Sequence, residues 1–228
     1  MQEPEMIPLE FQRLPEDEMR LRADDYGQRL ASRRSVRSFS SDSVPLGVVR
    51  TCIEAAASAP SGAHKQPWRF VLVTEPHLKR EIRLAAEAEE RENYGGRMNS
   101  KWIEDLAPLG TDHDKPFLEQ APCLIVIFRE AWGVDDAGDR RQHYYTQESV
   151  GIAAGFLLSA LHFAGLATLT HTPSPMGFLG TLLGQPQRMK AFLLIPVGYP
   201  ADGCQVPNLT RKSLDSVFYC DPGGQSSS

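Results

Sequence analysis

Three arginines lie within five residues in the first quarter of the chain. The segment reads RRSVR, in which Arg33, Arg34 and Arg37 surround Ser35. A guanidinium group carries a planar fork of donors that matches two phosphate oxygens at once, so such a cluster can hold a phosphate group. A solvated basic helix end would have the same spacing, and the segment alone leaves both interpretations open.

A second candidate is the loop PSGAHKQPW, residues 60–68, between an expected helix and an expected strand. Small residues such as Ser61 and Gly62 let a ligand approach the chain closely, and the N–H groups of the loop can then donate to it. An ordinary helix-to-strand connection of this composition is the alternative.

Several common kinds of site are not indicated. The sequence has no GxSxG, HExxH, Walker or strand-linked GxGxxG motif, and its six histidines lack metal-ligand spacing, so we expect no metal. The four cysteines form no CxxC pair, which favours free thiols in a reducing compartment over disulfides.

Composition limits the partners and the location. The net charge of −5 provides no bulk positive field for nucleic acid or anionic lipid. The acidic N-terminus does not resemble a signal peptide, and the longest apolar stretch, residues 150–166, is shorter than the roughly 20 residues that span a bilayer. We expect a soluble, cytoplasmic protein with no membrane or nucleic-acid partner.

Hydrophobic patterning predicts the elements that position these loops. Helices are expected at 15–32, 46–59, 76–94 and 148–165, and strands at 68–74, 123–128, 167–170 and 192–197. This order predicts one central sheet covered by helices, of class α+β or α/β. Residues 95–120, with a short amphipathic piece at 102–109, form either a lid or a poorly ordered segment, and 133–139 read as a turn-rich loop.

These motifs together resemble a known family. RRSVRSFS, APSGAHKQPWRFV and PVGYP with its basic arm resemble the nitroreductase superfamily, and LPEDEM, ENYGGRM, GLATLTHTP and VPNLTRKSLD narrow the resemblance to iodotyrosine deiodinases. It implies a nitroreductase-like α+β fold with a central mixed sheet flanked by helices, and extended terminal arms exchanged in a homodimer. It implies a single domain over residues 1–228, with an N-terminal arm (1–14), a substrate lid (95–116) and a C-terminal arm with a disordered tail (201–228).

FMN is the cofactor that the resemblance implies. Four segments would bind it, with these residues: Arg33, Arg34, Ser35, Arg37, Pro60, Ser61, Gly62, Thr170, His171, Thr172 and Arg211. Thr172 would be the catalytic residue, because its hydroxyl would bond flavin N5 and favour one-electron steps. His171 replaces the hydroxyl residue usual at its position, and we expect it to be structural.

The resemblance also implies a substrate, a free halotyrosine. Its ammonium needs a carboxylate, its carboxylate needs a cation, and Glu90, Tyr94 and Lys115 match the residues that supply these contacts. Glu90 and Tyr94 stand four apart, on one helical face. The phenolate would lie near the Ala63 N–H, as in an oxyanion hole. Without the resemblance, Glu90 would count among the solvated acids Glu87, Glu89 and Glu92, and Lys115 as a surface lysine.

The expected activity is therefore reductive dehalogenation of halotyrosines to tyrosine and halide, with a separate reductase as possible electron donor. The Gly/Ala-rich helix 149–166 is the candidate homodimer interface, or else a core helix. The alternatives are a general NAD(P)H-dependent nitroreductase and a non-catalytic flavin- or tyrosine-binding protein.

Overall fold

A four-stranded sheet forms the centre of the computed structural model, which describes residues 3–221. In spatial order its strands are β1 (Trp68–Val73), β2 (Cys123–Glu130), β6 (Met189–Gly198) and β5 (Ala167–Thr168). Neighbouring strands pair antiparallel, and a parallel bridge joins Ser35 to Thr168 at the β5 edge. The predicted mixed sheet within an α+β fold is confirmed.

The second strand is buried on both faces, as its continuous apolar run predicts. Leu124, Val126 and Phe128 pack into the core on one side of the sheet. The alternate positions, Cys123, Ile125 and Ile127, pack into the core on the other side. β2 therefore links two separate hydrophobic cores.

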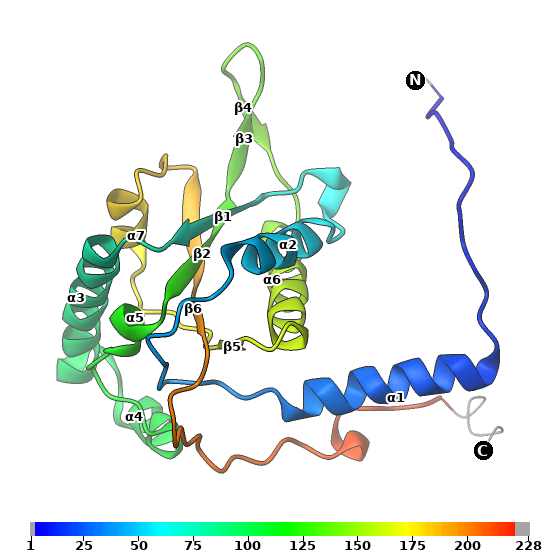
Figure 1. The fold of residues 1–228 in the computed structure, drawn as a ribbon. Helices are drawn as coiled ribbons and strands as arrows, with labels where there is room; N and C mark the ends of the chain where they lie inside the picture. Colours follow the sequence, from blue (N-terminus) through cyan, green and yellow to red (C-terminus); the bar gives the residue numbers. More distant parts are fainter. Residues whose placement is uncertain (1–2, 222–228) are drawn as a thin grey trace.

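Helices cover both faces of the sheet (Figure 1). One face carries α2 (Leu46–Ala57) and α6 (Thr146–Phe163), and the other carries α3 (Pro76–Glu92), α5 (Phe117–Gln120) and α7 (Gly177–Leu182). Each of the four long helices begins and ends within about two residues of its predicted bounds, because its apolar stripe is bounded by Pro, Gly or charged residues.

The first and last segments of the described residues lie outside this body (Figure 1). α1 (Glu16–Ser32) reaches α6 through a 2.8 Å hydrogen bond between Tyr26 Oη and Ser159 Oγ. Residues 3–14 are extended beyond α1, and the segment after residue 200, with its short 3-10 turn Leu214–Ser216, runs alongside that helix. Residues 222–228, which include the predicted disordered tail, are outside the described part.

One connecting segment differs from expectation, and a second is resolved between two alternatives. The loop predicted at 133–139 is a hairpin of β3 (Trp132–Val134) and β4 (Arg140–Gln142), whose turn is held by the Asp135 carboxylate accepting from the Asp139 N–H at 2.8 Å. The segment after α3 is folded: a π-helical turn (Asn93–Arg97) leads to α4 (Ser100–Leu106) and a 3-10 turn (Ala107–Leu109). Within residues 3–221, no helix has both the length and the apolarity needed to cross a bilayer.

Candidate active site

A basic cavity of about 370 Å³ lies between the end of α1 and the C-terminal arm. Its lining includes Arg33, Arg34, Ser35, Arg37 and Arg211. The Arg211 guanidinium donates to the Arg33 carbonyl at 2.7 Å, and that of Arg34 donates to the carbonyl of Pro207. These bonds attach the C-terminal arm to the RRSVR segment, so residues about 175 positions apart form one site.

The charges in this cavity favour an anion. Burial lowers the pKa of Arg33, and repulsion from Arg211 and Arg34 lowers it further. All titratable side chains among the described residues lining the cavity are arginines. A phosphate would offset this repulsion and match the donor forks of the guanidinium groups. The residues thus fit the phosphate end of a flavin mononucleotide.

A second cavity, of about 240 Å³, adjoins the first. The two share Arg37, Leu109, Leu169 and Thr170 in their linings. Its remaining lining includes five further candidate residues that the sequence singled out, namely Glu90, Tyr94, Lys115, His171 and Thr172. Residues from the helix expected at 76–94, from the expected lid and from the segment after residue 170 therefore line one cavity.

Glu90 and Lys115 form a buried ion pair in this second cavity. Lys115 Nζ lies 3.8 Å from Glu90 Oε2, and the two residues are 2% (Lys115) and 7% (Glu90) exposed. Burial raises the pKa of Glu90, and the Lys115 charge opposes that rise. Burial likewise lowers the pKa of Lys115, against the opposing effect of Glu90. Each charge is therefore stabilised mainly by the other.

The loop that precedes Lys115 encloses its ammonium group. Lys115 Nζ donates to Thr111 Oγ1 at 3.2 Å and to the Asp112 carbonyl. The Tyr94 hydroxyl donates to the Thr111 carbonyl at 3.0 Å, and the ammonium lies 5.9 Å from the centre of the Tyr94 ring. Tyr94 thus holds the loop that surrounds Lys115.

His171 lines the second cavity, and both its backbone and its ring have contacts in the fold. Its backbone forms a β-bridge with Leu194, and its ring meets the Phe117 ring edge-on at 5.6 Å. Burial, followed by the charges of Lys115 and Arg37, lowers the pKa of His171 to about 3. The ring is therefore neutral near pH 7, which suits the structural role expected of it and not that of an acid.

The loop of Pro60, Ser61, Gly62 and Ala63 lies elsewhere, beside the start of α6. The Gly62 N–H donates to Ser149 Oγ at 3.2 Å, and a Cβ on Gly62 would stand 2.8 Å from the Tyr144 carbonyl oxygen, so only glycine fits. Ala63 has φ +49°, a strained conformation for a residue with a side chain. Within a single chain, this loop therefore lies apart from the arginine cluster and from Glu90.

Some residues of the site were not identified from the sequence. Met98, Trp102, Leu106 and Thr111 also line the second cavity. Trp102 and Leu106 stand four apart in the amphipathic piece expected at 102–109, and that spacing is a signal for a shared face. Sequence patterning predicts that Glu87 is a solvated acid, but the residue is only 5% exposed, so this prediction is wrong.

Comparison with known proteins assigns the chain to a family. The model of the nitroreductase family matches residues 30–199. An iodotyrosine deiodinase of Haliscomenobacter hydrossis is 53% identical over 217 residues, which cover 95% of this chain and 98% of that protein. The chain belongs to the nitroreductase family and, within it, to the iodotyrosine deiodinases.

Other members of this family support the assignment. Iodotyrosine deiodinase 1 of Homo sapiens is 45% identical over 94% of this chain and 74% of its own length. A crystal structure of oxidized iodotyrosine deiodinase bound to FMN and 3-iodo-L-tyrosine superimposes with a TM-score of 0.74 at 31% identity, covering 82% of this chain and 95% of that one. The FMN- and NADPH-dependent nitroreductase NfnB, at 20% identity and a TM-score of 0.65, shares the fold.

Proposed function

We propose that this member of the family is an FMN-dependent oxidoreductase that removes halide reductively from halotyrosines. Its substrates would be 3-iodotyrosine and 3,5-diiodotyrosine, and its products tyrosine and halide. The observation that carries the proposal is the buried Glu90–Lys115 pair, which lines a cavity adjoining the arginine-lined one. The related crystal structure with FMN and 3-iodo-L-tyrosine supports the same assignment.

The first cavity would bind the phosphate end of FMN, and the second would bind the flavin ring and the substrate. Arg33, Arg34, Ser35, Arg37 and Arg211 would hold the phosphate and sugar-alcohol chain of FMN. When bound, FMN supplies the two electrons that, with one proton, replace the carbon–halogen bond by a carbon–hydrogen bond and release halide. Thr170, His171 and Thr172 line the adjoining cavity, where they would contact the flavin ring, with the Thr172 hydroxyl as the donor at N5.

Substrate recognition follows from the charges of the second cavity. The zwitterion brings an ammonium that can pair with Glu90 and a carboxylate that can pair with Lys115. Each protein charge would then exchange one buried partner for another, which avoids leaving an isolated charge away from water. Met98, Trp102 and Leu106 belong to the proposed lid, residues 95–116, and would cover the bound substrate and exclude water.

A homodimer would complete the site. The loop 60–63 lies apart from the arginine cluster in one chain, so a second copy is the natural source of its contact with the flavin, including the Ala63 N–H for the phenolate. Helix α6 packs one face into the core, and it exposes Ile152, Phe156 and Phe163 by 43%, 45% and 59%. An apolar cavity of about 530 Å³ between α1, α2 and α6 lies along the same surface.

The arms also fit an exchange between two copies. Exposed apolar side chains occur on both, at Met6, Ile7, Leu9 and Phe11 and at Val217, Phe218 and Tyr219. Apolar side chains that gather on an exposed segment in this way are typical of a surface that binds another chain. Exchange of the arms, a cytoplasmic location and a separate reductase as electron donor stay predictions.

The first experiment is an optical titration of the purified protein with 3-iodotyrosine, followed by an assay of iodide release with a chemical reductant. We expect a flavin spectrum and flavin fluorescence that the ligand quenches. Rapid NADPH oxidation by a nitroarene without halotyrosine binding would instead indicate a general nitroreductase. Tight binding without turnover would indicate a binding protein, and failure to take up FMN would contradict the proposal.

A further inference from the structure

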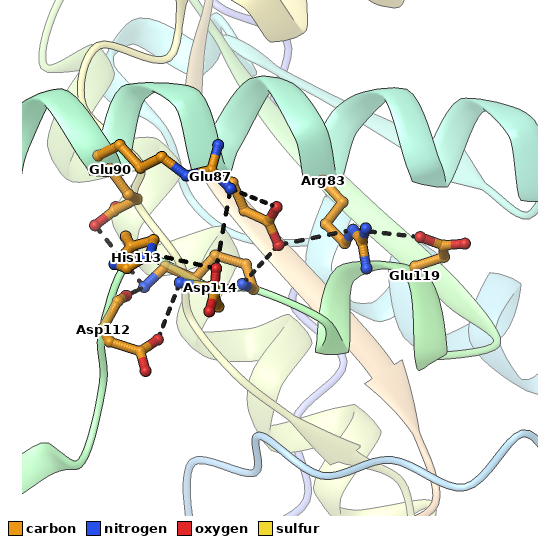
Figure 2. Close-up of polar contacts among 9 residues, drawn as sticks. Arg83, Glu87, Glu90, Asp112, His113, Asp114 and Glu119 are labelled. Carbon is orange, nitrogen blue, oxygen red and sulfur yellow. Dashed lines mark hydrogen bonds and ion pairs between the residues drawn. The ribbon is translucent and has the colours of Figure 1, made fainter.

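Glu87 has a buried carboxylate that the proposed reaction does not use. It lies on α3 one turn before Glu90 and is 5% exposed. Its Oε1 accepts the backbone N–H of Lys115 at 2.9 Å. Figure 2 shows Glu87 and Glu90 side by side on this helix, both facing the loop that carries Asp112, His113 and Asp114.

Two arginines of the same helix balance the Glu87 charge. Arg83 Nε lies 3.7 Å from Glu87 Oε1, and Arg91 Nη2 lies 3.3 Å from Oε2. Arg83 also pairs with Glu119 at 3.3 Å, and Arg91 with Asp114 at 3.9 Å. The carboxylate is therefore fixed from both sides, with little freedom to turn away from Lys115.

The bond to Glu87 fixes the place where the 95–116 segment rejoins the body. At the other end of that segment, Asn93 Nδ2 donates to the Ser174 carbonyl at 2.8 Å. With its main chain held by Glu87, Lys115 directs its ammonium to the neighbouring acid, Glu90, 3.8 Å away. The two acids thus contact different parts of one lysine: Glu87 its main chain and Glu90 its side chain.

We propose that Glu87 is a positioning residue for halotyrosine recognition, which holds the main chain of Lys115 so that its ammonium is already in place for the substrate carboxylate. This inference rests on the proposed function. Ordering a long charged side chain on binding costs entropy, and a site that is ordered beforehand avoids that cost. The role of Glu87 is thus exerted through Lys115, without contact with the substrate.

The test compares Glu87→Ala and Glu87→Gln with the wild-type protein loaded with FMN. We expect Glu87→Ala to weaken 3-iodotyrosine binding, followed by flavin fluorescence, by up to about tenfold, the cost of ordering one long side chain on binding. KM should rise while kcat at saturating substrate and FMN affinity stay unchanged. Glu87→Gln should recover part of the affinity, because its amide oxygen can still accept from Lys115. The matched control is Glu81→Gln, on the same helix, where the side chain is 46% exposed.

A double-mutant cycle with Lys115→Met separates positioning from general loss of structure. If Glu87 acts through Lys115, Glu87→Ala should add little to the loss of affinity in the Lys115→Met background. A full and independent loss in that background would overturn the inference, as would an unchanged affinity in Glu87→Ala.

Hydrogen exchange without substrate distinguishes this inference from the proposed function. Peptides covering 110–118 should exchange faster in Glu87→Ala than in the wild type, with 100–106 as internal comparison. Wild-type protein that does not bind 3-iodotyrosine would overturn both the proposed function and the role of Glu87 in recognition. Wild-type binding together with unchanged exchange at 110–118 in Glu87→Ala would overturn the inference alone.

Discussion

Lys115 Nζ and Glu90 Oε2 are 3.8 Å apart at a site where both residues are almost completely buried. Removing two charges from water is costly, and their mutual attraction offsets that cost only in part. Burial accordingly shifts the pKa of each toward its neutral form. A zwitterionic ligand that carries one charge of each sign suits such a pair, because it can replace each partner with an equivalent one.

The first prediction concerns the acidic half of this pair. Glu90→Gln should weaken 3-iodotyrosine binding by at least about tenfold, because the ligand ammonium loses a charged hydrogen-bond partner. Fluorescence titration of the FMN-loaded protein measures it. Glu92→Gln is the control, since that side chain is 70% exposed on the same part of the chain. An unchanged affinity in Glu90→Gln would refute the proposed recognition of the ammonium.

Loss of one arginine from the RRSVR cluster should not lower the Tm of the apoprotein, but it should weaken the binding of FMN. Arg33→Gln removes a charge repelled by Arg211 and Arg34, so the Tm of the apoprotein should stay constant or rise. FMN affinity should fall by about tenfold or more, because a charge-assisted bond to phosphate is lost. Thermal unfolding with and without FMN tests both effects. Arg50→Gln, at an 81% exposed side chain, should change neither.

His171 should make stability depend on pH. Its pKa is about 3 in the folded protein against an ordinary 6.5, so between these values the unfolded chain binds a proton that the folded chain does not. The neutral His171 ring therefore makes its full contribution to the free energy of unfolding above about pH 6.5, and this contribution decreases as the pH falls toward 3. Between pH 7 and pH 5 the loss is at most roughly 2 kcal/mol.

Urea unfolding at constant protein and FMN concentration measures that loss. His171→Thr should reduce the decrease in unfolding free energy between pH 7 and pH 5. His77→Thr, at a side chain that is 76% exposed, should leave the decrease as in the wild type. Equal pH dependence in His171→Thr and the wild type would show that the ring is not held neutral.

Substitution on the exposed face of α6 should separate the proposed dimer. In a two-fold dimer the interface would bury the Phe156 ring of both copies, and Phe156→Glu would replace each ring with a charge. The dimer dissociation constant should therefore rise by at least about a hundredfold. FMN content should fall with it. Sedimentation velocity and flavin absorbance measure the two effects. Leu84→Glu, on α3 with 46% exposure against 45% for Phe156, is the matched control. A dimer that survives Phe156→Glu would place the interface elsewhere.

Local sequence determined the elements of the fold and several parts of the site. The apolar run of β2 and the stripes of the long helices have short-range periodicity, so their bounds can be found without tertiary information. The arginine spacing in RRSVR made a phosphate site one of two open interpretations, and the resemblance to the nitroreductase superfamily favoured it over a solvated basic helix end. Glu90 and Tyr94 likewise share one helical face by their spacing of four residues alone.

Only the tertiary structure decided which of these residues meet. Glu87 and Glu90 are both acids on a charged helix, and sequence patterning assigned both to solvent. The loop 111–115 folds over this helix and buries them, and that long-range contact gives each acid a different part of Lys115. Packing likewise separates Gly62 from Arg33. The Gly62 N–H donates to Ser149 at the start of α6, whereas the Arg33 carbonyl accepts from Arg211 of the C-terminal arm. Short-range patterns carry no information about such contacts, since burial depends on segments distant in the chain.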